Sequence, residues 1–237
     1  MTKKLNIKLY ADGADIGEMY RLYANKVVSG FTTNPTLMKK AGVRNYEEFA
    51  KQVLELIPDV SISFEVFSDD LKNMEKEAEK ISSWGDNVYV KIPVTNTKGK
   101  STEPLIENLA SQGIQLNVTA ILTSDQVNTV VNVLDTHTPS IVSVFAGRIA
   151  DTGRDPVETM TNALPMVRRN KNCELLWAST REMYNLVQAE QVGCHIITVP
   201  NDILKKLSML DKDLNELSLD TVRMFKQDAI SAGYKIL

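Results

Sequence analysis

The chain of 237 residues contains only two cysteines and two histidines. Cys173 and Cys194 are too few for a disulfide framework and lack metal-ligand spacing, so we expect both to be buried apolar side chains. His137 falls in a connection and His195 begins a strand, which argues against a histidine-based triad or a zinc site. We therefore expect no metal.

Long apolar runs and clusters of one charge are also missing. No apolar run approaches the roughly 20 residues that span a bilayer, and residues 1–15 contain no signal-peptide core. Lysines and arginines are dispersed, and the net charge is −3, which argues against nucleic acid as the main partner. We predict a soluble, cytoplasmic protein that contacts neither membrane nor nucleic acid. Two or three local cations would still suffice for an anionic substrate.

Short β-rich runs alternate with longer amphipathic segments along the whole chain. The pattern predicts strands at 7–11, 27–33, 61–67, 87–94, 114–120, 140–146, 173–179 and 195–200. It predicts helices near 14–25, 44–56, 70–84, 102–112, 124–136, 156–169, 181–191 and 202–208, with a final helix at about 218–232.

This alternation indicates a parallel sheet in an α/β protein. Eight units without a linker favour a (β/α)8 TIM barrel as one domain over residues 1–237. The surplus last helix is expected to pack on the barrel or on a neighbouring subunit. An open, doubly wound sheet is the alternative, but no G-x-G-x-x-G follows the first strand.

Several helix ends carry recognisable signals. Asp155 followed by Pro156 predicts a helix start with a capping residue and a proline at the first position. Thr123 and Gln126 have the spacing of a capping box. Gly233 is placed to end the last helix.

Polar side chains interrupt strands that should be apolar when both faces are buried. In the fourth strand Lys91 alternates with valine and isoleucine, and in the fifth Asn117 and Thr119 lie opposite Leu116, Val118 and Ala120. Strand parity likewise groups Ser63, Glu65 and Phe67 on one face of the third strand. We expect the polar set to point into the barrel near its C-terminal end: Asp12, Thr32, Asn34, Glu65, Lys91, Asn117, Thr119, Ser143 and Ser179.

Each of these residues has an ordinary alternative explanation. A strand serine or threonine is usually a hydrogen-bonded filler, Asn34 before Pro35 is typical of a turn, and Asp12 could cap a helix. Lys91 could lie on a wet edge strand. The group as a whole is harder to explain in this way, because a dry barrel interior does not accept so many polar groups without a purpose.

Lys91 carries the strongest chemical implication. Inside a barrel this amine is desolvated, and burial disfavours the charged ammonium form. A neutral lysine can attack a ketose carbonyl and form an imine, which acts as an electron sink for cleavage of a C–C bond. This imine chemistry needs no cofactor. Glu65, Asp12 and Thr119 are the groups placed to move the protons that this chemistry needs, with a water shared between Glu65 and Thr119.

Two arginines follow late strands. Arg148 lies just after the sixth strand and Arg181 just after the seventh, next to Ser179. Barrel enzymes often bind phosphate in these late loops, where arginine and backbone N–H groups converge. The alternative is that Arg148 pairs with Asp151 or Asp155 and that Arg181 only begins a solvated helix.

Five segments together resemble the transaldolase family, which includes the fructose-6-phosphate aldolases. The order and spacing of the five carry the resemblance, which runs through most of the chain. The segments are FTTNPTLM (31–38), NVYVKIPVT (87–95), NVTAILT (117–123), SVFAGRIAD (143–151) and ASTRE (178–182). The first-strand segment LYADGAD is a looser match.

The resemblance implies a barrel with a Schiff-base lysine on the fourth strand, which is Lys91. It implies that Asp12 is a general acid and base and that Glu65 and Thr119 hold the catalytic water. The residues that it implies for substrate binding are Thr32, Asn34, Asn117, Ser143, Phe145, Arg148, Ser179 and Arg181.

Two positions separate the subgroups of this family. The resemblance to transaldolases is closer at Glu65 and Phe145, because the aldolases carry glutamine and tyrosine there. It implies transfer of a dihydroxyacetone unit from sedoheptulose 7-phosphate or fructose 6-phosphate to an aldose phosphate, as in the pentose phosphate pathway. The alternatives are a lyase that releases free dihydroxyacetone and a non-catalytic sugar-phosphate-binding barrel. The resemblance also implies a homo-oligomer: members of the compact subgroup often form decamers through the terminal helix, whereas longer members tend to be dimers.

Overall fold

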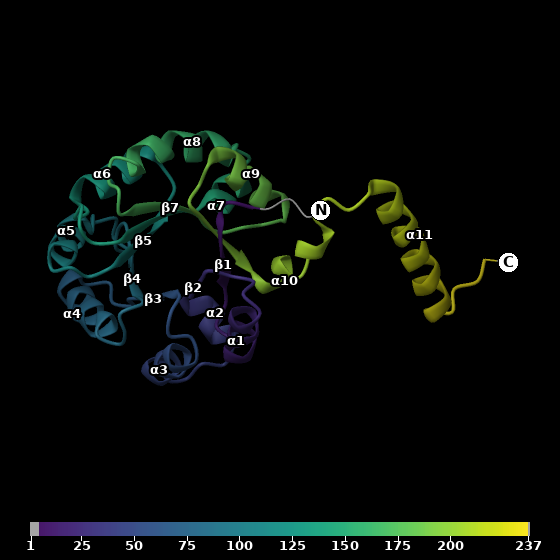
Figure 1. The fold of residues 1–237 in the computed structure, drawn as a ribbon, viewed down its shortest axis with the longest axis horizontal. Coiled ribbons are helices and arrows are strands. Elements are labelled where there is room, and N and C mark those ends of the chain that lie inside the picture. The colour runs from purple at the N-terminus through teal and green to yellow at the C-terminus, as the bar shows by residue number, and fades with distance from the viewer. Residues whose placement is uncertain (1–4, 237) are drawn as a thin grey trace. The chain divides into compact units, whose positions relative to one another are not determined.

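The computed structural model describes residues 5–236, which divide into a unit of residues 5–204 and a unit of residues 205–236. In the first unit eight parallel strands close into a barrel in sequence order (Figure 1). The strands are β1 Lys8–Asp12, β2 Gly30–Thr32, β3 Ser61–Glu65, β4 Val88–Pro93, β5 Leu116–Ile121, β6 Ser140–Val144, β7 Cys173–Trp177 and β8 Ile196–Pro200. The predicted barrel is therefore confirmed, and each strand overlaps its predicted range.

Helices on the outside of the barrel connect successive strands (Figure 1). They are α1 Ile16–Ala24, α2 Pro35–Lys40, α3 Tyr46–Leu56, α4 Leu71–Ser82, α5 Glu103–Ser111, α6 Ser124–Val133, α7 Ala146–Asp151, α8 Pro156–Val167, α9 Tyr184–Val192 and α10 Asn201–Leu204. The six-residue helices α2 and α7 were not expected. The helix predicted over 202–208 is wrong in extent, because this stretch forms only the short helix α10 and the start of a separate 3₁₀ turn, Leu207–Met209.

The predicted caps are present. The Asp155 carboxylate accepts from the backbone N–H of Val157 at the start of α8, and Thr123 and Gln126 form a reciprocal capping box at α6. The side chain of Asn34 caps α2, with Pro35 at its first position. The Asn-Pro pair was thus a helix start rather than a turn alone.

Apolar side chains close the interior of the barrel below the strand ends. Tyr10, Ile141, Leu176 and Ile196 form a buried cluster contributed by β1, β6, β7 and β8, with Tyr89 packed against it. This cluster closes the lower part of the barrel interior, because the polar residues of the strands lie further towards the C-terminal strand ends. The two cysteines are free and buried, as expected.

Strand alternation fails at two places. The β5–β6 register shifts between Val118 and Ile121, and Ala120 has a φ of 61°, so a bulge interrupts the alternation directly after Thr119. The regular alternation that placed Ala120 on the face of Val118 therefore does not continue to this residue. Phe67 lies beyond the end of β3, 52% exposed and packed on Tyr46, so the prediction that it shares the face of Ser63 and Glu65 is wrong.

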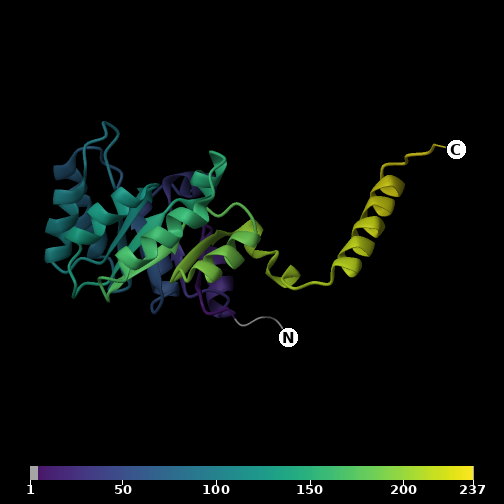
Figure 2. The ribbon, with the colours of Figure 1, turned by 90° about the horizontal axis from the view of Figure 1, so that it is seen from above.

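The second unit contains a 3₁₀ turn, Leu207–Met209, and one helix, α11 Leu214–Ser231, drawn in yellow in Figure 2. The helix begins four residues before the predicted start because the Asp213 carboxylate accepts from the first N–H groups. Gly233 follows its end with a φ of 70°, as predicted. Within residues 5–236 no helix combines the length and the apolarity needed to cross a bilayer.

Candidate active site

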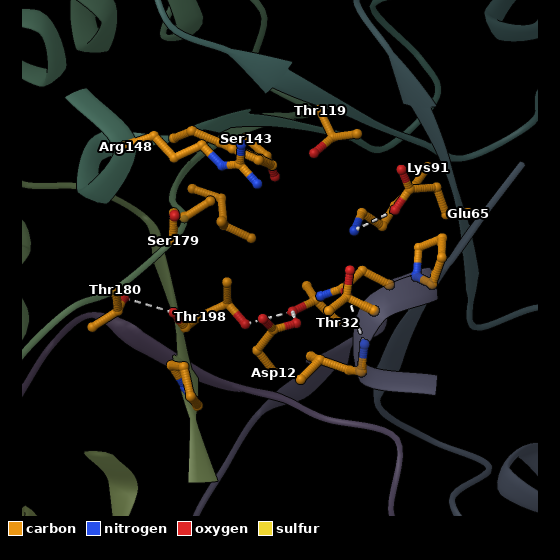
Figure 3. A pocket seen from close by; sticks show the side chains of 18 of the residues that line it. Asp12, Thr32, Glu65, Lys91, Thr119, Ser143, Arg148, Ser179, Thr180 and Thr198 are labelled. Carbon is orange, nitrogen blue, oxygen red and sulfur yellow. Dashed lines mark hydrogen bonds and ion pairs between the residues drawn. The ribbon is translucent and has the colours of Figure 1, made fainter. Parts of the chain in front are cut away.

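A cavity of about 390 Å³ opens at the C-terminal ends of the strands (Figure 3). Eleven of the twelve residues predicted for the site line it: Asp12, Thr32, Asn34, Glu65, Lys91, Thr119, Ser143, Phe145, Arg148, Ser179 and Arg181. Most of the barrel strands contribute to this set, directly or through the loop that follows. Strand parity, the late loops and the family resemblance together thus predicted side chains that converge from distant parts of the chain.

Lys91 lies at the centre of the polar set and is only 6% exposed. Its Nζ lies 3.0 Å from Glu65 Oε2 and donates a hydrogen bond to the Thr33 carbonyl at 2.7 Å. Glu65 and Lys91 are register partners on adjacent parallel strands, so both side chains point to the same face. Lys91 is therefore on the barrel interior, not on a wet edge strand.

Asp12 ends β1 on the opposite side of the cavity. Its Oδ1 accepts from Thr32 Oγ1 at 2.8 Å, and Thr32 Oγ1 lies 2.6 Å from Thr198 Oγ1. Burial raises the pKa of Asp12, with Lys91 and the Thr32 hydrogen bond acting against this and Glu65 adding to it. A raised pKa suits a carboxyl group that must both take and return a proton. Asp12 does not cap α1, because Asp15 does.

Thr119 presents its hydroxyl to the cavity from β5 (Figure 3). The hydroxyl is buried and has no hydrogen-bond partner among residues 5–236. A buried hydroxyl without a partner is costly unless water reaches it, and Glu65 lines the same cavity. The arrangement therefore has room and polar partners for the water that we expect between Glu65 and Thr119.

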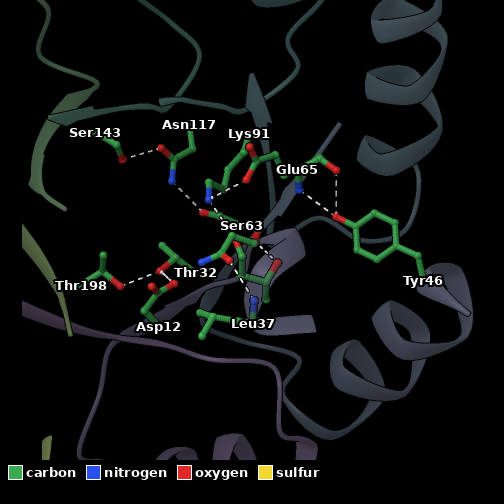
Figure 4. Close-up of polar contacts among 12 residues, drawn as sticks. Asp12, Thr32, Leu37, Tyr46, Ser63, Glu65, Lys91, Asn117, Ser143 and Thr198 are labelled. Atoms are coloured by element: carbon green, nitrogen blue, oxygen red, sulfur yellow. Dashed lines mark hydrogen bonds and ion pairs between the residues drawn. The ribbon is translucent and has the colours of Figure 1, made fainter. Parts of the chain in front are cut away.

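Asn117 is the one predicted site residue that does not line the cavity. Its side chain is fully buried, with Nδ2 donating to Ser63 Oγ at 2.9 Å and Oδ1 accepting from Ser143 Oγ at 2.6 Å (Figure 4). This chain of hydrogen bonds runs from β3 to β6 and passes Lys91, the register partner of Asn117. The side chain is placed to hold neighbouring strands and Ser143, and its role in substrate binding stays a prediction.

Arg148 approaches the cavity from α7, which follows β6, and Arg181 from the loop that follows β7. The Arg148 guanidinium carbon lies 5.5 Å from the centre of the Phe145 ring. Arg181 instead forms a forked ion pair with Asp151, with Arg181 Nη2 2.6 Å from Asp151 Oδ2. Asp151, the partner considered for Arg148, thus pairs with Arg181, and the Arg148 guanidinium stays at the cavity wall. Both arginines, with Ser179, form a positive end of the cavity.

Gly147 explains how these loops come so close. A Cβ built on Gly147 would lie 1.6 Å from the Ser179 carbonyl oxygen, so no other residue fits without a backbone shift. Ser179 itself has a φ of 66°, a left-handed conformation that non-glycine residues rarely adopt. Local strain of this kind is typical of ligand-binding loops.

Several groups at the site were missed by sequence reasoning, and three of them make hydrogen bonds there. The Thr33 carbonyl is a backbone acceptor, which has no signature in a sequence. Thr198 lies in the strand IITVP, where its parity places it on the inner face. Thr180 follows Ser179 and donates to the Thr198 carbonyl at 2.7 Å. Parity could have found Thr198, but nothing local could have found the carbonyl.

Comparison with known families matches residues 9–236 to the Transaldolase/Fructose-6-phosphate aldolase family. A probable transaldolase of Thermoanaerobacter sp. is 32% identical over 231 residues, which is 97% of this chain and 100% of the relative. A probable transaldolase 2 of Listeria monocytogenes is 32% identical over 202 residues, 85% of this chain and 88% of the relative. A probable transaldolase of Methanococcus maripaludis is 31% identical, with 85% and 89% covered.

Two solved structures share the fold alone. KGPDC from Streptococcus mutans matches with a TM-score of 0.57 at 12% identity, over 84% of this chain and 90% of that one. A putative isomerase from Sinorhizobium meliloti matches with a TM-score of 0.59 at 11% identity, over 88% and 55%. These likenesses agree with the barrel.

Proposed function

The chain belongs to the transaldolase/fructose-6-phosphate aldolase family, and from this premise we propose that it is a transaldolase. In this proposal it transfers a dihydroxyacetone unit from a ketose phosphate, such as fructose 6-phosphate or sedoheptulose 7-phosphate, to an aldose phosphate. The observation that carries the proposal is the buried Lys91 amine, 3.0 Å from the Glu65 carboxylate in a polar cavity.

The first step is formation of an imine on Lys91. Transfer of a proton from the amine to Glu65, its neighbour at 3.0 Å, leaves a lone pair on Nζ that attacks the ketone carbon. The carbinolamine then loses its hydroxyl as water, which needs a proton donor. Glu65, with water held at Thr119, is placed to supply that proton.

The second step breaks the C3–C4 bond of the donor. Asp12 takes the proton of the C4 hydroxyl, the C–C electrons move into the iminium, and an aldose phosphate leaves. An enamine of dihydroxyacetone stays on Lys91. In the reverse sense the enamine attacks the acceptor aldehyde, Asp12 returns its proton, and water releases the new ketose.

Phe145 is the residue that favours transfer over simple cleavage. It lines the cavity beside Arg148 and has no hydroxyl with which to protonate the enamine carbon. The enamine should therefore persist until an aldehyde arrives. The proposal also includes that the enzyme is cytoplasmic and oligomeric and that it acts in the pentose phosphate pathway.

Phosphate recognition is assigned to the positive end of the cavity. Arg148 lines this end, and Arg181 uses Nε and Nη2 in its ion pair with Asp151, which leaves Nη1 outside that pair. Arginine forks match phosphate oxygens well. A sugar bound with its carbonyl at Lys91 and its phosphate at the arginines would lie along the cavity between them.

Borohydride trapping tests the central assignment. The protein is incubated with fructose 6-phosphate, reduced, and analysed by mass spectrometry of peptides. A reduced three-carbon or six-carbon adduct is expected on the peptide that contains Lys91, and none in Lys91→Ala. Binding of the sugar phosphate without any adduct would support the non-catalytic alternative and refute the proposal.

A second assay separates transfer from cleavage. With the donor alone, little free dihydroxyacetone is expected, and an added aldose phosphate should restore continuous turnover. Phe145→Tyr is expected to release more free dihydroxyacetone, because it adds an acid beside the enamine. Rapid release by the unmodified protein without an acceptor would favour the lyase alternative.

A further inference from the structure

Tyr46, outside the cavity, holds both backbone polar groups of Glu65. The Glu65 N–H donates to Tyr46 Oη at 2.7 Å, and Tyr46 Oη donates to the Glu65 carbonyl at 3.0 Å (Figure 4). One hydroxyl thus acts as acceptor and donor for the same residue. Tyr46 begins α3 and is not part of the barrel sheet. It does not line the cavity that holds Lys91.

Glu65 needs this hydroxyl because β2 ends early. The last hydrogen bond of the β2–β3 ladder runs from the Thr33 N–H to the Ser63 carbonyl. The next bond of a parallel ladder would run from the Glu65 N–H to the Thr33 carbonyl. That carbonyl instead accepts from Lys91 Nζ at 2.7 Å.

The following ladder bond is also impossible. It would run from the N–H of residue 35 to the Glu65 carbonyl, but residue 35 is proline and has no N–H. Both partners that β2 would offer to Glu65 are therefore lost. A buried backbone group without a partner is costly, and Tyr46 replaces both partners at once.

The ring of Tyr46 is fixed by aromatic neighbours. It makes edge contacts with Phe64, with ring centres 6.1 Å apart, and with Trp84, at 5.4 Å. It also packs against Phe67 at 4.6 Å. Burial raises the pKa of Tyr46, so the hydroxyl keeps the proton that it donates. The hydroxyl therefore has a fixed position relative to β3.

We propose that Tyr46 is a positioning residue, which replaces the missing β2 strand at Glu65, fixes the Glu65 carboxylate beside Lys91, and leaves the Thr33 carbonyl free to orient the Lys91 amine. Because the carboxylate acts in proton transfer during imine formation, this inference rests on the proposed function. Tyr46 touches neither substrate nor the reacting atoms.

Tyr46→Phe is the direct test, because it removes only the hydroxyl and keeps the aromatic contacts. The rate of imine formation, measured by rapid-quench borohydride trapping, is expected to fall roughly 10- to 100-fold, as for an ångström-scale misplacement of a catalytic group. The KM for the ketose phosphate should stay within about threefold of the parent value. In a Glu65→Ala background the same substitution should change the rate less than about twofold, since no carboxylate is left to position.

Tyr10→Phe is the matched control. Tyr10 is also buried, and its hydroxyl also bonds to β3, at Ser61 Oγ. Ser61 is at the other end of β3 from Glu65, and Tyr10 does not line the cavity. This variant should lose stability while its rate of imine formation stays within about twofold of the parent value. The proposal would be overturned if Tyr46→Phe and Tyr10→Phe lost the same amount of rate. It would also be overturned if Tyr46→Phe reduced the rate as much in the Glu65→Ala background as in the parent protein.

Hydrogen exchange gives a readout that does not depend on activity. In the unmodified protein, the Glu65 amide is expected to be protected although β2 offers it no acceptor. Residue-resolved exchange should rise at Glu65 in Tyr46→Phe while Phe64 and Val66, whose amides face β4, stay protected. Rapid exchange of the Glu65 amide in the unmodified protein would refute the role of Tyr46. A missing borohydride adduct in that protein would refute only the proposed function.

Discussion

Gly147→Ala tests the close approach that forms the positive end of the cavity. The added Cβ would lie 1.6 Å from the Ser179 carbonyl oxygen, whereas real Cβ contacts are essentially never under 3.0 Å, so the two backbones would have to separate by at least about 1.4 Å. The atom in the way is a backbone carbonyl, so no side chain can simply rotate aside.

The expected cost follows from this geometry. Overpacking of a dense interior typically costs about 1–3 kcal/mol, and each kcal/mol lowers the melting temperature of a domain of this size by about 2–4 °C. A fall of about 2–12 °C is therefore expected. Since the shift moves Arg148 away from Ser179, kcat/KM for a phosphorylated donor should fall by roughly 100-fold.

Thermal unfolding followed by circular dichroism, together with steady-state kinetics, measures both effects. Gly17→Ala is the matched control, because Gly17 is also the second residue of a helix. A Cβ there meets only Asp15 Oδ1, at an ordinary 3.5 Å, so alanine should be neutral or stabilising by up to about 1 kcal/mol. A Gly147→Ala protein with unchanged melting temperature and unchanged kinetics would refute the account of this site.

Two further predictions concern charge. Burial raises the pKa of Asp12, so the acidic limb of the pH profile for donor cleavage should lie above the ordinary aspartate range near 4, and Asp12→Asn should abolish cleavage while still giving the borohydride adduct. The folded state binds this proton more tightly than the unfolded chain does, so the contribution of Asp12 to stability falls as the pH rises through the raised pKa; urea titrations should find that the stability of Asp12→Asn relative to the parent protein increases as the pH rises above about 4. Arg148→Ala should raise the KM for fructose 6-phosphate by about 10- to 100-fold, the equivalent of one charge-assisted hydrogen bond, and leave the KM for unphosphorylated fructose unchanged; equal losses for both sugars would contradict a phosphate contact.

The barrel could be predicted because its signals are local and repeated. Each strand is a short apolar run, each is followed by an amphipathic segment, and the pattern recurs eight times. The short helices α2 and α7 were not predicted because six residues give too few turns for a helical period of apolar residues to be recognised. For α2 a local signal existed in Asn34 and Pro35, since the asparagine caps the helix and the proline begins it.

Most of the site could also be predicted, because strand parity sorts side chains into inner and outer faces. Parity failed where the backbone departs from a regular strand. At Ala120 a residue with positive φ interrupts β5, and β3 ends before Phe67. Such departures from regular strand geometry depend on tertiary contacts, so no local sequence pattern predicts them.

The contacts of Lys91 show a second limit of sequence reasoning. A lysine inside a barrel strand is visible in the sequence, but its orientation depends on the Thr33 carbonyl, and that carbonyl is free only because β2 stops pairing with β3. The loss of pairing depends in turn on Pro35, which cannot donate, and on Tyr46, which supplies the missing partners from another helix. Each of these residues has an ordinary explanation when taken alone: a helix-starting proline, an aromatic core residue and a strand threonine. Their joint effect follows only from the hydrogen bonds that the Glu65 backbone makes and lacks, so Lys91, the proposed nucleophile, is oriented by a break in the sheet as much as by the strand that carries it.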